Sequence, residues 1–143
     1  MSVHPVPAGP SAALIASVPL MGALRLGIGG WAAAAPRRVA DGVGVSADQQ
    51  EAAVPYVRAL AARELALAVG AFAAYRRGRS CAGWVAAMAA SDAFDALVYE
   101  VLAELGTLDA RKARRSTVVA LAGAVPEAVL ALALARAARS SDH

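Results

Sequence analysis

Residues 80–105 read SCAGWVAAMAASDAFDALVYEVLAEL, an apolar stretch of membrane-spanning length with two aspartates near its middle. A helix of about 20 residues, rising about 1.5 Å per residue, crosses the hydrocarbon core of a bilayer. Charge at that depth is costly, so such residues normally face a bundle interior or a cavity. Asp92 and Asp95 therefore predict a helix that turns this face toward other helices.

Three more stretches of the chain share this character. Each is rich in Ala, Leu and Val, and each carries internal charge: Arg25 in the first, Arg63 and Glu64 in the second, and Glu127 in the last. The expected helices cover about 11–35, 54–75, 80–105 and 114–138. We therefore predict an all-α fold, a four-transmembrane-helix bundle that forms a single membrane-embedded domain over residues 1–143.

The ends of the helices are marked by breaker residues and aromatic residues. Pro36 and Gly106 are expected to end the first and third helices. In the polar connection 36–53, the sequence SADQ from Ser46 resembles a capping box and predicts a short interfacial helix. Aromatic residues fall toward helix ends, as in interfacial belts: Trp31, Tyr56, Tyr75, Trp84 and Tyr99.

Small residues predict where helices approach one another. Ala62, Ala66, Gly70 and Ala74 recur every four residues and form a predicted packing ridge. The run from Gly27 to Gly30 predicts a second packing patch.

A soluble Ala-rich four-helix bundle is the alternative to a membrane protein. It would hide the internal charges without lipid, but it needs polar outer faces. Stretches such as LALAVGAFAAY and STVVALAGAVPEAVLALALA are apolar all round, and 59% of the 143 residues are hydrophobic. We therefore expect a multi-pass protein of the cell membrane. Arginine far outnumbers lysine and asparagine is absent, a bias typical of GC-rich bacterial genomes, so the expected location is a bacterial inner membrane.

The basic residues punctuate the apolar stretches. They are Arg37, Arg38, Arg76, Arg77, Arg79, Arg111, Lys112, Arg114, Arg115, Arg136 and Arg139. This placement indicates contact with membrane lipids and not with nucleic acid, which would need basic residues along one face. The two sides of the membrane receive nearly equal basic charge, which is compatible with dual insertion and an antiparallel homodimer.

Several catalytic classes lack their residues. His4 and His143, the two histidines, stand at the ends of the chain, and Cys81 is the one cysteine. A Ser-His-Asp triad, a Cys-His pair and a histidine-ligated zinc or haem site are therefore not expected. We expect no metal site and no cofactor.

The sharpest chemical signal lies on one helix face. Met88, Asp92, Asp95 and Tyr99 follow the spacing i, i+4, i+7 and i+11. Two carboxylates one turn apart do not both ionise easily in a low dielectric unless a cation lies close. This arrangement suits a general acid beside an ionised partner. A lone DxxD also begins an aspartate-rich magnesium-diphosphate motif, but no second motif accompanies it.

Arginines on the other helices provide counter-charges. Two arginines, Arg25 and Arg63, face four acids, so we expect that not every acid has an arginine and that one or two are protonated. Glu127 follows Pro126, which frees a backbone carbonyl and bends the helix. The candidate catalytic residues are Asp92, Asp95 and Glu64. The candidate substrate-binding residues are Arg25, Arg63, Met88, Tyr99 and Glu127.

Three segments resemble a known group of proteins: RLGIGGWAAAAPRRVA from Arg25, RALAARELALAVGAFAAYRRG from Arg58, and SDAFDAL from Ser91. They are similar to small bacterial four-helix membrane proteins that are loosely DoxX-like. The resemblance covers the first three helices. It implies the fold and no particular activity, because that group has no settled one. A thinner analogy links the isolated acids to membrane-bound terpenoid cyclases.

These features favour an intramembrane acid–base enzyme that acts on a lipophilic small molecule. A cofactor-independent isomerase, cyclase or epoxide-opening hydrolase would need only a proton donor, a carboxylate and an apolar pocket. The alternatives are a small proton-coupled multidrug-type exporter and a non-catalytic membrane subunit whose charges fix helix register.

Overall fold

The computed structural model describes residues 12–141, and these form five α-helices. They are α1 (Ala12–Ala34), α2 (Pro36–Val43), α3 (Gln50–Arg76), α4 (Ala82–Glu104) and α5 (Ala110–Ser141). The all-α prediction is confirmed. Each of the four long predicted helices corresponds to one of α1, α3, α4 and α5, and α2 is an additional short helix.

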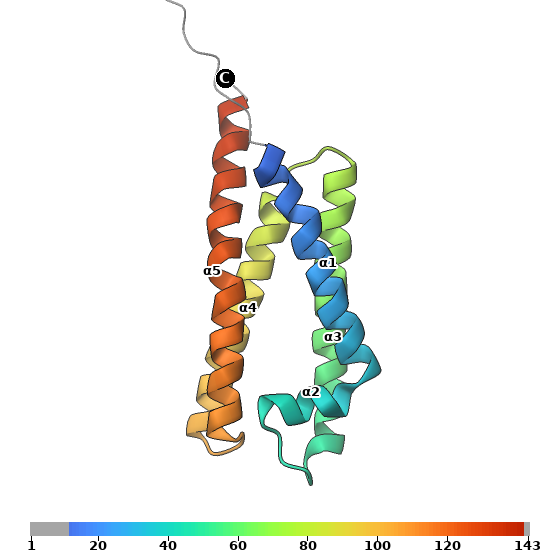
Figure 1. Ribbon diagram of the computed structural model, residues 1–143, viewed down its shortest axis with the longest axis vertical. Coiled ribbons are helices and arrows are strands. Elements are labelled where there is room, and N and C mark those ends of the chain that lie inside the picture. Colours follow the sequence, from blue (N-terminus) through green and yellow to red (C-terminus); the bar gives the residue numbers. More distant parts are fainter. Residues whose placement is uncertain (1–11, 142–143) are drawn as a thin grey trace, which may run out of the picture.

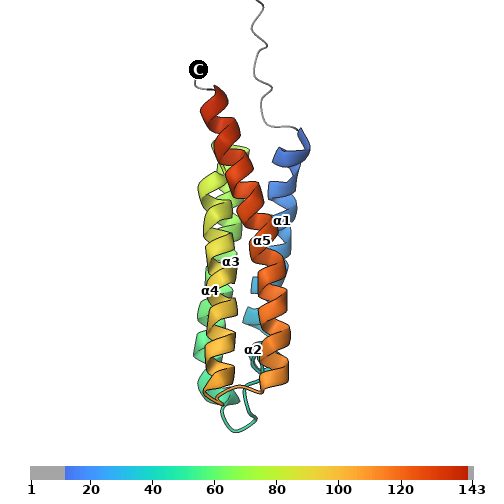
Figure 2. The ribbon, with the colours of Figure 1, turned by 90° about the vertical axis from the view of Figure 1, so that its left-hand side faces the viewer.

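The four long helices run side by side, and α2 lies across one end of them (Figures 1 and 2). Along the chain the long helices alternate in direction. The closest pairs are α1 with α3 and α4 with α5, while α2 packs on α3 and reaches α5. We call the end formed by α2 and residues 105–109 the α2 end. The turn between α3 and α4 lies at the opposite end.

The short helix begins earlier than predicted. The expected helix from Ser46 is wrong: residues 47–49 form a turn, and α2 starts at Pro36. Proline at the first helical position is pre-organised for a helix, and Gly44 ends it with a left-handed φ of 101°. A hydrogen bond from the Ser46 side chain lowers the pKa of the exposed Asp48 carboxyl. The serine side chain therefore binds within the turn.

The last helix also begins earlier than expected, at Ala110 and not near residue 114. The Asp109 carboxylate accepts a hydrogen bond from the backbone N–H of Lys112 at 2.9 Å, which caps the first turn. The basic run predicted as a loop is thus helical. Gly106 follows α4 with a φ of 69°, as its predicted role as a helix stop requires.

The apolar core has two parts, one on either side of the charged residues. Toward the opposite end, Val18, Val85, Met88 and Leu130 pack among α1, α4 and α5. Toward the α2 end, a smaller group joins α1, α2 and α3; its buried residues are Ala32, Ala40, Val57 and Ala61. The charged side chains of the long helices lie between these two groups.

The predicted small-residue ridge on α3 holds in its second half only, where Gly70 packs against Trp84 of α4 and Ala74 is buried. Ala62 and Ala66 are exposed, and the buried face carries Ala61, Ala68 and Ala71 instead. Residues spaced by four drift around a helix of 3.6 residues per turn, so one such row cannot stay on an inner face. Alanine occurs on every side of α3, so the sequence pattern alone does not show which row of small residues faces the other helices.

Within the glycine run of α1, only Gly29 packs closely against α3. A Cβ atom added at Gly29 would lie 3.1 Å from the Ala61 carbonyl oxygen and 3.0 Å from Leu65 Cγ. A Cβ atom at Gly27 or Gly30 would meet open space. The prediction of a packing patch therefore holds for one of these glycines, and the backbones of α1 and α3 approach there.

Gly29→Ala should destabilise the bundle, and Gly30→Ala should not. Crowding against a backbone carbonyl typically costs about 1 to 3 kcal/mol. Alanine in an uncrowded helix position instead gains about 1 kcal/mol over glycine. Thermal melting of the purified variants in detergent provides the comparison. Equal melting temperatures for the two variants would contradict the close contact between α1 and α3.

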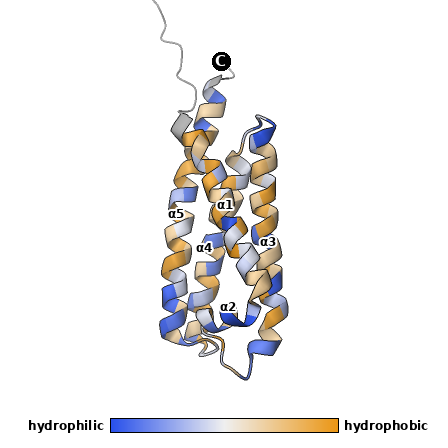
Figure 3. Ribbon diagram, turned by 45° about the vertical axis from the view of Figure 1, so that its right-hand side comes forward, coloured by the Kyte–Doolittle hydropathy of each residue, from blue (hydrophilic) through white to orange (hydrophobic). Residues whose placement is uncertain are grey.

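The surface of the bundle is unusually apolar. Large hydrophobic side chains that are more than half exposed occur on all four long helices: Leu20, Leu24, Val69, Phe94, Leu97, Val118, Val125 and Val129. Hydrophobic residues predominate along the long helices, and hydrophilic residues gather at the α2 end and again where α3 ends, at the opposite end (Figure 3). Within residues 12–141, two segments are long and apolar enough to cross a membrane, Leu14–Ala34 and Ala110–Ser140. The more numerous internal charges of α3 and α4 lower the hydropathy of those helices.

Candidate functional site

Six charged side chains from all four long helices meet in the middle of the bundle. We call this group the ionic cluster; its members are Arg25, Arg63, Glu64, Asp92, Asp95 and Glu127. The sequence predicted each of them as a site residue. Their meeting confirms that the four helices hide a shared group of charges.

Arg25 on α1 is the centre of the cluster. Its Nη2 lies 2.7 Å and 2.8 Å from the two carboxylate oxygens of Glu127 on α5 and 3.0 Å from Asp92 on α4. Its Nη1 pairs with Glu64 on α3. The same guanidinium donates to the backbone carbonyl of Met88 at 3.2 Å. One buried side chain thus binds α1 to the other three long helices.

Arg63 on α3 forms the second centre. It donates a fork of two hydrogen bonds to Asp95 on α4, at 2.9 Å and 2.5 Å. It also contacts Glu64, its neighbour in sequence, at 3.0 Å. Because Glu64 pairs with Arg25 as well, it joins the two arginines into one continuous network. A planar guanidinium is suited to such sharing, because it has five donors in fixed directions.

The expectation that some acid would lack an arginine is wrong. Each of the four carboxylates lies within ion-pair distance of Arg25 or Arg63, because both arginines are shared. The formal charges remain unequal, with two cations among four acids. The protonation of one or two acids stays a prediction.

The cluster has an inner part and an outer part. The side chains of Arg25, Glu64 and Glu127 are 4%, 4% and 7% exposed. Those of Asp92, Asp95 and Arg63 are 20%, 18% and 32% exposed. The two glutamates are therefore sealed inside the bundle, while the two aspartates can be reached from outside. The outer edge lies where Arg63 on α3 meets Asp95 on α4.

A glycine on α5 makes room for one of the aspartates. A Cβ atom added at Gly123 would collide with the Asp92 carboxylate. Gly123 precedes Glu127 by one helical turn, so both residues lie on the face of α5 that meets the cluster. Gly123 was not among the predicted site residues, although a glycine one helical turn before Glu127 is a signal that points to close packing at this face.

The two remaining site candidates flank the aspartates on α4. The Met88 side chain is fully buried and packs in the larger apolar core, so its contact with the cluster is made by its backbone carbonyl. Tyr99 is partly buried, one turn beyond Asp95 on the same helix face. The predicted stripe on α4 is therefore continuous, but its first residue contributes to packing.

Two cavities occur at the α2 end, and neither is lined by a residue of the ionic cluster. Within residues 12–141, no group of three or more His, Cys, Asp or Glu side chains is arranged to hold a metal ion. The guanidinium groups occupy the space between the carboxylates. His4 and His143 lie outside the described residues.

No known protein family, curated protein or solved structure matches this chain. The DoxX-like relation stays a prediction, and the site has to be interpreted from its own geometry.

Proposed function

We propose that this chain is a multi-pass membrane protein in which α1, α3, α4 and α5 all cross the bilayer. Large apolar side chains point outward from each of these helices, which is rare on a soluble monomer. Arg63 of α3 and Asp95 of α4 pair with each other between the helices, and this pairing offsets the cost of placing the two charges at that depth. Polar residues gather instead at the α2 end and at the turn after α3, at the two levels expected for lipid headgroups.

This location predicts that the protein resists extraction at high pH. After membranes are washed with alkaline carbonate, the chain should remain in the pellet. Its apolar, lipid-facing side chains would otherwise be exposed to water, which is unfavourable. Immunodetection of a tagged chain in pellet and supernatant measures the distribution. Recovery in the supernatant as a soluble, monodisperse protein would show that the bundle is not integral to the membrane.

We infer that the outer part of the ionic cluster is an acid–base site for a lipophilic small molecule. The observation that carries this inference is the difference in exposure between the reachable aspartates and the sealed glutamates. A structural pin needs no exposed carboxylate, whereas proton transfer to a substrate requires one within reach. The inner residues Arg25, Glu64 and Glu127 then hold the aspartates in place.

The contacts assign different roles to the two aspartates. Both oxygens of Asp95 are held by the Arg63 fork, which fixes the orientation of this carboxylate at the outer edge of the cluster, and we assign it as the general base. Asp92 has one contact with Arg25, a guanidinium that also serves Glu64 and Glu127. Because it shares that positive charge with two other acids, Asp92 is the best candidate to carry a proton and act as the general acid.

This pair supports reactions that only move protons or add water. In an isomerisation or cyclisation, Asp92 donates a proton at one atom of the substrate and Asp95 removes one from another, so the product has the same mass. In the opening of an epoxide, Asp95 takes a proton from water, the resulting hydroxide attacks carbon, and Asp92 protonates the leaving oxygen. The mass of the product then exceeds that of the substrate by one water molecule.

Incubating the purified protein with bacterial lipid extracts tests the proposed acid–base activity. Mass spectrometry should find a lipophilic component that is converted, in a time-dependent way, to a product of equal mass or one water heavier.

Proton-coupled export is the second candidate function, and the surplus of acids over arginines in the cluster favours it. Sealed vesicles with an imposed pH gradient would then move substrate without altering its mass. If neither conversion nor transport is found, the cluster is a register-fixing device of a non-catalytic subunit. An antiparallel homodimer is compatible with all three functions.

A further inference from the structure

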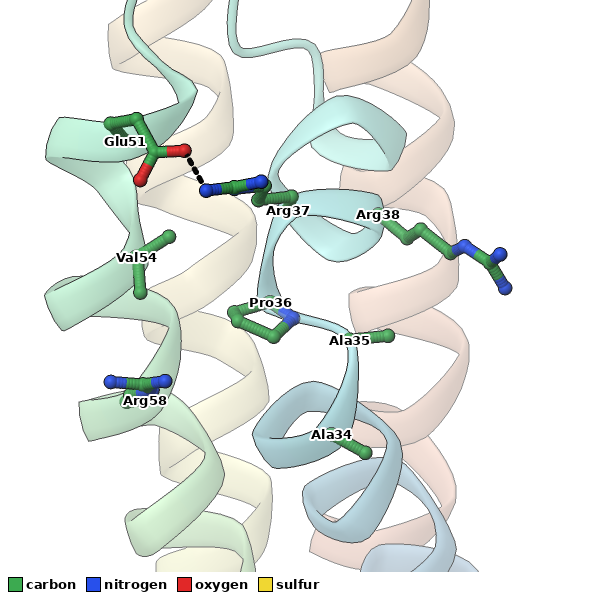
Figure 4. Close-up of a pocket in the computed structure, with 8 residues that line it drawn as sticks. All are labelled: Ala34, Ala35, Pro36, Arg37, Arg38, Glu51, Val54 and Arg58. Carbon is green, nitrogen blue, oxygen red and sulfur yellow. Dashed lines mark ion pairs between the residues drawn. The ribbon is translucent and has the colours of Figure 1, made fainter.

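A cavity of about 730 Å³ opens at the corner between α1 and α2. Its charged lining comes from Arg37 and Arg38 on α2 and from Glu51 and Arg58 on α3 (Figure 4). Apolar side chains, including Val54, complete its wall. This site is separate from the ionic cluster, and the acid–base function does not use it.

The cavity lining carries three arginines and one glutamate, so its positive charge is only partly neutralised. Arg37 pairs with Glu51, and both side chains of that pair are largely exposed. Within the described part of the chain, neither Arg38 nor Arg58 forms an ion pair. Figure 4 shows Arg38 directed away from Arg37 and Glu51. Arg58 and Arg38 are therefore the two cations of the cavity lining that have no acidic partner.

Two exposed aromatic residues mark the level of this cavity along the bundle. Trp31 lies about one helical turn before the end of α1, and Tyr56 lies in the second turn of α3. Trp and Tyr with exposed rings are enriched where lipid headgroups meet the hydrocarbon core. If the bundle spans the bilayer, the cavity is at the depth of the lipid phosphates.

We propose that this cavity binds an anionic phosphate group, with Arg58 and Arg37 as its direct contacts and Arg38 as a supporting charge. Guanidinium groups recognise phosphate oxygens through paired, charge-assisted hydrogen bonds. Two sources supply this chemistry: the headgroup of an anionic phospholipid and a free phosphate in the aqueous phase. The lipid source rests on the proposed membrane location.

The two tryptophans make the lipid source measurable. Trp31 is beside the cavity, whereas Trp84 is in the first turn of α4 at the opposite end. Trp84→Phe leaves Trp31 as the reporter, and Trp31→Phe leaves Trp84. Each protein is reconstituted with brominated phosphatidylglycerol or brominated phosphatidylcholine, whose bromine atoms quench nearby indole fluorescence. Trp31 should be quenched preferentially by phosphatidylglycerol, by about fivefold in relative affinity, the usual effect of one arginine near an anionic lipid surface.

Arg58→Gln should remove that preference, and Arg77→Gln, a matched change at the opposite end, should preserve it. Equal quenching of Trp31 by both lipids overturns the lipid source but leaves the membrane location intact. If neither lipid quenches either tryptophan, the membrane location itself is contradicted.

Binding of free phosphate is tested by comparing melting in inorganic phosphate with melting in chloride of equal ionic strength. A rise in melting temperature that Arg58→Gln abolishes identifies the free anion as ligand. No lipid preference and no phosphate-dependent rise together overturn the proposal.

Discussion

Arg25→Ala is expected to abolish the folded bundle. Removing one partner of a buried ion pair typically costs about 3 to 5 kcal/mol, because a charge is left stranded. Here three carboxylates lose the same cation, and two of them, Glu64 and Glu127, are sealed inside the protein. Domains have only about 5 to 15 kcal/mol of stability in total. Size-exclusion chromatography in detergent should show aggregated or greatly reduced protein.

Two further variants distinguish two causes of destabilisation: a buried charge left without a partner, and the loss of the arginine side chain itself. Arg63→Ala should be milder than Arg25→Ala, because Arg63 and its partner Asp95 are both partly exposed. A compensated variant, Arg25→Met with Glu64→Gln and Glu127→Gln, removes the cation and its two sealed partners together. Because buried ion pairs are often replaceable by neutral residues at little cost, this variant should recover much of the folded yield. If Arg25→Ala melts like the parent, the cluster does not hold the helices together.

The sequence predicted which residues meet, and it predicted that Arg25 and Arg63 are the counter-charges of Asp92 and Asp95, which the structure confirms. It did not predict that Arg25 is shared with Glu64 and Glu127. A charged residue in the middle of an apolar helix is least costly when it lies in the interior shared with other helices. Arg25, Asp92 and Glu127 are therefore identifiable as interior residues from the sequence. The pairing depends on the rotation of each helix about its axis, which an Ala-rich sequence leaves nearly undetermined. The exposure of Ala62 and Ala66 in the first half of the predicted ridge and the unforeseen sharing of Arg25 have this common cause.

Local signals also compete, and the structure shows which one determines the helix boundary. Between α1 and α3 the sequence offers two helix starts, Pro36 and the SADQ segment at Ser46. The segment from Pro36 forms the helix, since proline fixes the first helical φ angle and Gly44 provides the left-handed stop. The Ser46 side chain bonds within its own turn. The SADQ segment instead lies directly before α3, whose N-cap Gln49 makes no side-chain capping hydrogen bond.

The reachable aspartates lead to the second large expected effect. Asp92→Asn and Asp95→Asn keep the shape and the hydrogen-bonding capacity of the side chain but remove its proton exchange. Each should lower the rate of the proposed conversion by about 100-fold or more, the usual contribution of a general acid or base. Neither should unfold the bundle, because both side chains are partly exposed and the inner contacts of Arg25 with Glu64 and Glu127 remain.

The rate is measured as the mass-balanced conversion of the lipophilic component, and folding is verified by thermal melting of the same samples. Glu104→Gln is the matched control, because it neutralises an exposed carboxylate on the same helix outside the ionic cluster. It should keep the parental rate. The two aspartate variants should differ in stability: Asp95→Asn leaves Arg63 with one acidic partner, Glu64, whereas Asp92→Asn lowers the number of acids that share Arg25. Asp92→Asn should therefore melt at the higher temperature. Two folded variants that both retain the full rate would remove these aspartates from the chemistry.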